Sequence, residues 1–164
     1  MSGEGIVAVP MAGERKGAAG TPQSRWVHVN RRVAAPPARV FTAWTAPAEL
    51  VCWFPFAVEG SLEPGARAVL QWPDRATWWE MIRIVPGREL SFRWPWLADD
   101  SWRTVVTVRL HTEREGTLVS LEDGPFDVAE PALLDAYAEA TGGWTEALAQ
   151  LRAYLDFGID LRVH

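Results

Sequence analysis

The feature that most constrains the fold is a long amphipathic segment near the C-terminus, Pro131–Phe157. Large apolar side chains recur in it at three- and four-residue steps, so they share one face of a helix. They are Tyr137, Trp144, Leu148, Leu151 and Leu155. A helix of this length with one apolar face needs a broad apolar surface to cover that face.

Two adjacent glycines, Gly142 and Gly143, lie in the middle of this segment, directly before Trp144. A glycine inside a helix costs roughly 1 kcal/mol relative to alanine. The pair therefore indicates that another group passes close to the backbone or that the helix bends. Two readings stay open: a bare patch of backbone that gives a cavity room, or a kink that divides the helix in two.

Short strands with turn signals between them precede the helix. Residues 26–33 alternate apolar and polar side chains, and prolines then introduce two short helices, the second at about 48–54. Six further strands follow. The sequence Asp123-Gly124-Pro125 is expected to break the sheet, and Asp127 or Glu130 is expected to cap the long helix. The expected strands are 56–62, 66–72, 78–85, 88–96, 102–112 and, after a hairpin turn, 117–122.

This order predicts an α+β fold. A curved antiparallel sheet of about six to seven strands should wrap around the long C-terminal helix, with two short helices after the first strand. The domain should span residues 25–164. Residues 1–24 are rich in glycine, alanine and proline without periodicity, and they read as a disordered tail.

Composition narrows the classes of function. The net charge of −5 argues against nucleic acid as a partner, and no apolar run reaches the ~20 residues that span a bilayer. Cys52 is the single cysteine, which excludes a disulfide framework and favours a reducing cytoplasm. The first ten residues lack the features of an export signal.

Several segments, taken in order, resemble one family. The matching residues are Val33-Ala34-Ala35-Pro36, Val40-Phe41, Ala43-Trp44-Thr45, Pro47, Leu50, Trp53-Phe54, Leu62, Pro64-Gly65, Val85-Pro86, Leu90, Phe92, Trp94, Val106, Leu110, Gly116-Thr117, Val119, Leu121, Gly143-Trp144, Leu148 and Leu151. They are similar to the START-like (SRPBCC, helix-grip) superfamily, in the branch homologous to the activator of heat-shock-protein-90 ATPase. The resemblance covers about residues 26–157.

The resemblance implies a cavity between helix and sheet that holds an apolar small molecule. Relatives include lipid carriers, hormone receptors, polyketide aromatase/cyclases and chaperone activators linked to the stress response, so the fold does not fix the activity. Many relatives carry a histidine after the last strand, whereas this chain has Asp123 there. No role of that histidine carries over.

The ten tryptophans are the strongest functional signal, because rigid rings suit a lined cavity as well as a core. We predict that ligand-binding residues come from the strand rings and the long helix. They are Trp53, Phe54, Trp79, Phe92, Trp94, Tyr137, Trp144 and Leu148. Arg93 and Arg103 could hold an acidic ligand at an opening, but solvated surface arginines are the simpler interpretation.

Catalytic and metal chemistry have little support. His28, His111 and His164 lie in different elements without a second metal ligand nearby, so we expect no metal and no cofactor. Among the carboxylates, alternation places Asp123 on the inward face and Glu80 and Glu122 on the outer face. Asp123 is therefore the weak candidate for an acid or base, since aromatic walls would disfavour its charged form.

The sequence thus favours a non-enzymatic protein that binds a small hydrophobic or aromatic ligand. Two alternatives stay open: an aromatase/cyclase-like enzyme that uses a pocket carboxylate, and a chaperone-associated protein-binding module. A protein partner or a homodimer formed through the sheet edge is compatible with the sequence. A membrane partner is not expected.

Overall fold

The computed structural model describes residues 23–162, and one antiparallel sheet of seven strands organises them. The strand order is β1-β7-β6-β5-β4-β3-β2. Consecutive strands from β2 to β7 are therefore adjacent in the sheet, and β1 pairs with β7. The strands are β1 (Ser24–Val33), β2 (Ala57–Gly60), β3 (Arg67–Gln71), β4 (Ala76–Val85), β5 (Glu89–Pro95), β6 (Arg103–Glu113) and β7 (Gly116–Asp127).

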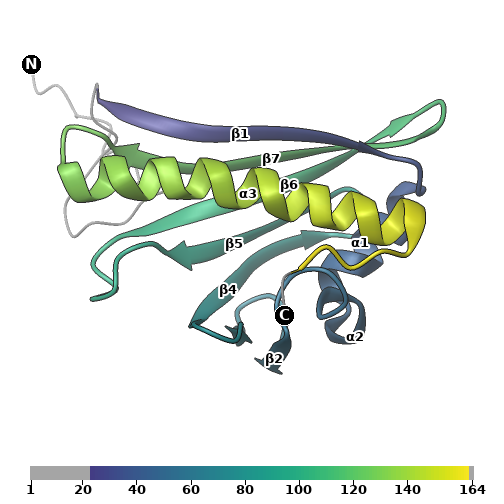
Figure 1. Cartoon of the computed structure of the whole chain (residues 1–164), viewed down its shortest axis with the longest axis horizontal. Helices are drawn as coiled ribbons and strands as arrows, with labels where there is room; N and C mark the ends of the chain where they lie inside the picture. The colour runs from purple at the N-terminus through teal and green to yellow at the C-terminus, as the bar shows by residue number, and fades with distance from the viewer. Residues whose placement is uncertain (1–22, 163–164) are drawn as a thin grey trace, which may run out of the picture.

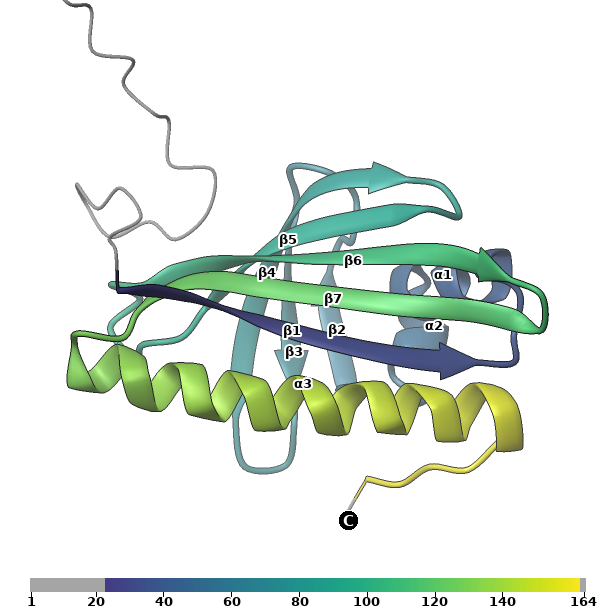
Figure 2. The same ribbon diagram turned by 90° about the horizontal axis from the view of Figure 1, so that it is seen from above.

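The sheet curves around α3 (Pro131–Phe157), which lies along its concave face (Figure 1). In the view of Figure 2, α3 runs beside β1, and α1 (Pro37–Thr45) and α2 (Pro47–Leu50) cover one end of the sheet. The predicted helix-grip fold, with two short helices after the first strand, is confirmed.

The alternation seen in the sequence sets which face is buried. On β5, Leu90, Phe92 and Trp94 are buried against the helix side. On the convex face, Glu80 pairs with Arg93 at 2.9 Å, and Glu122 pairs with Arg109 at 3.1 Å. Glu80 and Glu122 therefore lie on the outer face, as the alternation predicted.

Two local predictions were wrong. The sheet does not end at Asp123, because β7 continues to Asp127. Trp26 of β1 stands opposite both Gly124 and Pro125, and this bulge accommodates a proline that cannot donate to the ladder. A Cβ on Gly124 would lie 2.7 Å from the Trp26 ring, so glycine allows the indole to cover the strand there.

The second short helix is also shorter than expected. It ends at Leu50, and hydrogen-bonded turns carry the chain from there to Phe54. At the start of α3, Glu130 occupies the N-cap position, although its side chain does not cap the helix, and Pro131 follows in the first turn. Asp127 accepts the backbone N–H of Ala129 at 3.2 Å, so it stabilises the approach to the helix rather than the helix itself.

α3 is one continuous helix of 27 residues through Gly142 and Gly143. A Cβ built on either glycine would meet nothing within 4 Å, so no group passes close to the backbone there. The helix ends at Gly158, whose left-handed backbone (φ 65°) turns the chain back, while Ile159 donates its N–H to Ala153. The helix is therefore not divided in two at the glycines, and the other reading from the sequence, a bare patch of backbone beside a cavity, is favoured.

None of the helices formed by residues 23–162 is long and apolar enough to cross a membrane.

Candidate functional site

A cluster of aromatic rings fills most of the space between α3 and the sheet. Its members are Trp44, Trp53, Phe54, Trp79, Phe92, Trp94 and Trp144, hereafter the aromatic cluster. Each is at most 7% exposed, and centroids of neighbouring rings lie 4.3–6.5 Å apart. Edge-to-face and tilted contacts of this kind add to the burial energy of each ring. The cluster is therefore a packed core along much of its length.

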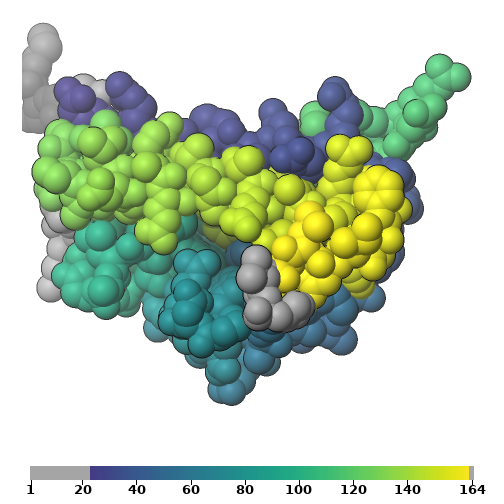
Figure 3. Space-filling view, viewed as in Figure 1, coloured from purple at the N-terminus to yellow at the C-terminus, as the bar shows by residue number. Residues whose placement is uncertain are grey.

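Two hollows open on the flank of this cluster, between the middle of α3 and the turn that joins β3 to β4. The larger hollow has a volume of about 410 Å³. Its lining residues are Phe54, Phe56, Trp72, Pro73, Asp74, Arg75, Gly143, Glu146, Ala147, Gln150 and Arg162. In Figure 3 this flank faces the viewer, below the green and yellow helix and beside the yellow C-terminal segment.

The smaller hollow has a volume of about 50 Å³ and adjoins the larger one. Phe54, Arg75 and Gly143 line both, which makes them the boundary between the two spaces. The other lining residues of the smaller hollow are Trp94, Trp96, Glu139 and Trp144. A space of this size holds a few water molecules or one substituent of a larger ligand.

Gly143 explains why the hollows exist at this point of the helix. It lines both spaces, and the room where its Cβ would stand is open. Gly142 faces outward and lines neither. The bare backbone predicted from the sequence therefore lies at the junction of the two hollows, which supports the reading that it gives a cavity room.

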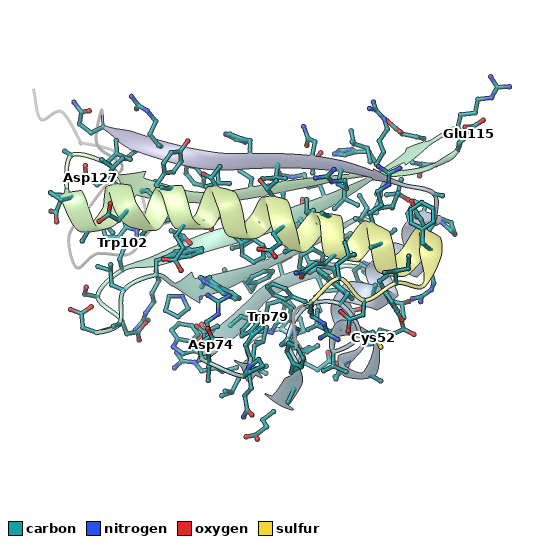
Figure 4. All side chains as sticks on the ribbon, viewed as in Figure 1. Cys52, Asp74, Trp79, Trp102, Glu115 and Asp127 are labelled. Carbon is teal, nitrogen blue, oxygen red and sulfur yellow. The ribbon has the colours of Figure 1, made fainter. Side chains whose placement is uncertain are left out.

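The eight residues predicted to bind a ligand divide into two groups. Phe54, Trp94 and Trp144 line a hollow, so a ligand in that hollow would contact them. Their role in ligand binding stays a prediction. The other five line neither hollow: Tyr137 is half-buried, and Trp53, Trp79, Phe92 and Leu148 are packed in the core. In Figure 4, Trp79 lies inside the molecule and Asp74 at the β3–β4 turn.

The sequence reasoning did not identify Trp72 and Arg75 as lining residues. Arg75 lies 4.8 Å above the Trp72 ring and 3.9 Å from the Glu139 carboxylate across the mouth of the smaller hollow. Trp72 directly follows β3 and precedes Pro73 in the turn to β4. Arg93 and Arg103 lie elsewhere, in pairs with Glu80 and Asp100.

Asp123 is the most unusual polar group of the interior. Its side chain is fully buried, and its Oδ2 accepts the indole N–H of Trp144 at 2.8 Å. Its Oδ1 has no hydrogen-bond partner among residues 23–162. An unpaired buried acceptor costs about 1–3 kcal/mol.

Burial raises the pKa of Asp123 to about 7, although the nearby Thr104 hydroxyl and the indoles of Trp144 and Trp96 oppose this rise. Trp96 also donates its N–H to the Thr104 hydroxyl at 2.9 Å. The inward position predicted for Asp123 is therefore observed, whereas its suggested role in catalysis stays a prediction. Asp123 does not itself line either hollow, because the indoles of Trp96 and Trp144 stand in front of it.

A second polar cluster joins the short helices to the end of α3. Tyr154 donates its hydroxyl to Glu49, and Arg39 donates to Glu49 at 2.8 Å and to Tyr154 at 3.2 Å. The hydrogen bond from Tyr154, with that from Arg39, lowers the pKa of the Glu49 carboxyl. Nearby Cys52 is half-buried, with its Sγ 3.2 Å from the Ala48 carbonyl. None of these side chains lines the two hollows.

The C-terminal segment forms one wall of the larger hollow. Arg162 donates to the carbonyls of Val51 and Pro55, both at 2.7 Å, and its guanidinium lies 4.5 Å above the Phe56 ring. Asp160 holds the same guanidinium at 2.6 Å. The segment after α3 is thus anchored across the flank of the domain.

Within the described residues, no group of three or more His, Cys, Asp and Glu side chains could hold a metal ion.

Solved structures with this architecture include close matches in shape. Protein MLL2253 from Mesorhizobium loti is 26% identical with a TM-score of 0.70, over 80% of this chain and 96% of that one. CalU16 from Micromonospora echinospora is 27% identical with a TM-score of 0.66, over 80% and 74% of the two chains.

The Aha1 dimer from Colwellia psychrerythraea has a TM-score of 0.72 at 16% identity, over 82% of this chain and 98% of that one, which shows a shared fold alone. A search of curated proteins found no match. The family model described as "Activator of Hsp90 ATPase homolog 1-like protein" matches residues 34–156. That match spans the region from the first helices to the end of α3, and the chain therefore belongs to the Activator of Hsp90 ATPase homolog 1-like family, within the helix-grip fold.

Proposed function

We propose that this protein binds a small hydrophobic or aromatic ligand in the two adjoining hollows beside α3. The observation that carries the proposal is the bare backbone of Gly143 at their junction, faced by the rings of Phe54, Trp94 and Trp144. Binding sites for small molecules are concave and mostly apolar, with few polar groups. A flat ring system would lie over Phe54 and Trp72 in the larger hollow, with one substituent in the smaller one.

The test compares two variants of neighbouring glycines. Gly143→Leu places a side chain in the hollows, whereas Gly142→Leu makes the same change on the exposed side of the helix. Wild-type protein and both variants are titrated with naphthalene and with a fatty acid, and binding is read by tryptophan fluorescence and native mass spectrometry. We expect Gly143→Leu to weaken binding at least tenfold and Gly142→Leu to bind like the wild type. Absence of any response in the wild type, or equal binding by both variants, contradicts the proposal.

A cyclase-like reaction is the second candidate, because Asp123 is a buried carboxyl with a pKa near 7, where it could donate or accept a proton. Its position behind Trp96 and Trp144 favours a binding role, since a general acid needs contact with the reacting atoms. Should a turnover reaction be found, Asp123→Asn is expected to lower its kcat at least a hundredfold. Unchanged kcat in that variant would remove this candidate.

A further inference from the structure

Within residues 23–162, Arg75 is the one charged side chain that lines both hollows. Its guanidinium lies 4.8 Å above the ring of Trp72, an arrangement in which the ring face attracts the cation. Trp72 in turn contacts the aromatic cluster, with its ring centroid 5.2 Å from that of Phe54 and 6.4 Å from that of Trp94. Arg75 is therefore held against the aromatic wall at the junction of the two hollows.

The donors of Arg75 are free for a ligand, unlike those of the other arginine beside the hollows. The Arg162 guanidinium is used by the carbonyls of Val51 and Pro55 and by the Asp160 carboxylate. The Arg75 guanidinium donates no hydrogen bond to the described part of the chain, and its carboxylate neighbour is Glu139 at 3.9 Å. That separation is too long for a hydrogen bond, so an incoming acceptor displaces little.

Three carboxylates also line the hollows, but none of them lies at the junction. Glu139 lines the smaller hollow, whereas Asp74 and Glu146 line the larger one. All three side chains are exposed, so water hydrates and screens their charges. A ligand that extends from one hollow into the other passes Arg75 directly, where contact with a guanidinium is stronger than repulsion from hydrated carboxylates.

We propose that the ligand is an aromatic carboxylic acid whose carboxylate binds Arg75 at the junction of the hollows and takes the place of Glu139. The inference rests on the proposed function, because the aromatic ring itself occupies the larger hollow. A guanidinium donates two parallel N–H groups to one carboxylate, and it keeps its stacking on an aromatic ring while it does so. Arg75 would then select an acid over an uncharged ring system of the same shape, and Glu139 would compete with the ligand.

The experiment uses three probes built on one ring system: 2-naphthoate, naphthalene and 2-naphthylmethylamine. Their affinities are measured by tryptophan fluorescence for the wild type, Arg75→Gln, Glu139→Gln and the control Arg83→Gln. Arg83 is a matched control, because it is 65% exposed, lies 3.6 Å from the Glu89 carboxylate and lines neither hollow.

We expect the wild type and Arg83→Gln to bind 2-naphthoate at least fivefold more tightly than naphthalene, and the amine more weakly than 2-naphthoate. Arg75→Gln should lose the preference for the acid and keep its affinity for naphthalene, which also shows that the variant is folded. Glu139→Gln should bind 2-naphthoate at least twofold more tightly than the wild type, with naphthalene unchanged, because the competing carboxylate is gone.

Equal affinity of the wild type for 2-naphthoate and naphthalene overturns the inference and leaves the proposed function standing. Tighter binding of the amine than of the acid overturns it too, since the three carboxylates would then set the charge of the ligand. A preference for the acid that survives in Arg75→Gln, or that weakens in Glu139→Gln, shows that another group holds the carboxylate and has the same consequence. Absence of binding by all three probes overturns both proposals together.

Discussion

At the scale of single residues, Asp123 links the folding of this protein to pH. The pKa of the carboxyl rises from 3.8 to about 7 on folding because burial disfavours its charge. Between these two pH values the folded state holds a proton that the unfolded state has released. The contribution of Asp123 to stability is therefore most favourable below about pH 4, falls as the pH rises through this window, and is least favourable above about pH 7.

This sign gives the first prediction. Asp123→Asn removes the titration and keeps an oxygen that can accept the Trp144 N–H, so the variant should gain stability relative to the wild type as pH rises. The relative gain from about pH 5 to about pH 8 should be of the order of a few kcal/mol. Urea unfolding of both proteins at these two pH values measures it. A stability difference that is independent of pH would show that Asp123 does not titrate in this range.

Single residues also show where reading the sequence was limited. Alternation correctly placed Asp123 inside and Glu80 and Glu122 outside, because a strand sends successive side chains to opposite faces. The same rule cannot tell a ring that lines a hollow from a ring packed behind it. Trp79 and Trp94 both point inward, yet only Trp94 reaches a hollow, since that depends on the curvature of the sheet and on Gly143 of a distant helix.

At the scale of elements, α3 gives a prediction about its two glycines. Each has open space where a Cβ would stand, and neither requires a left-handed backbone. Gly142→Ala and Gly143→Ala should therefore each raise the free energy of unfolding by about 1 kcal/mol, through better helix propensity. Thermal or urea unfolding of the two variants checks this. Destabilisation by either alanine would mean that another group approaches the helix at that position.

The order and type of the elements could be predicted because their periodicities differ so clearly. The apolar stripe of α3 recurs at three- and four-residue steps and indicates a helix, whereas the strict alternation of apolar and polar side chains in β5 indicates a strand. The end of β7 could not be predicted, since glycine and proline normally stop a strand. Here a long-range feature outweighs that tendency: Trp26 of β1 covers Gly124 and stands opposite two residues of β7.

At the scale of the whole molecule, Arg162 joins the end of the chain to the connection between α2 and β2. Arg162→Ala leaves the carbonyls of Val51 and Pro55 without their donor, so we expect a loss of about 1–3 kcal/mol in stability. Amide hydrogen exchange should become faster in residues 158–162 and in residues 51–56. Urea unfolding and exchange mass spectrometry give the two measurements.

The control for this prediction is Arg152→Ala. That arginine is half exposed, and its ion pair with Asp156 spans 3.4 Å on the surface of α3, so its removal should change stability by less than about 1 kcal/mol. Equal effects of the two alanine variants would contradict an anchoring role for Arg162.

The anchored C-terminal segment has a practical consequence for anyone who prepares this protein. Arg162 lies on the wall of the larger hollow. An affinity tag, a fluorophore or a fusion partner attached directly after this residue therefore begins within reach of the hollow. A polyhistidine tag at that position would compete for the space and would be read as a weak native ligand in a binding screen. Labels for such screens therefore belong on the convex face of the sheet, away from this flank.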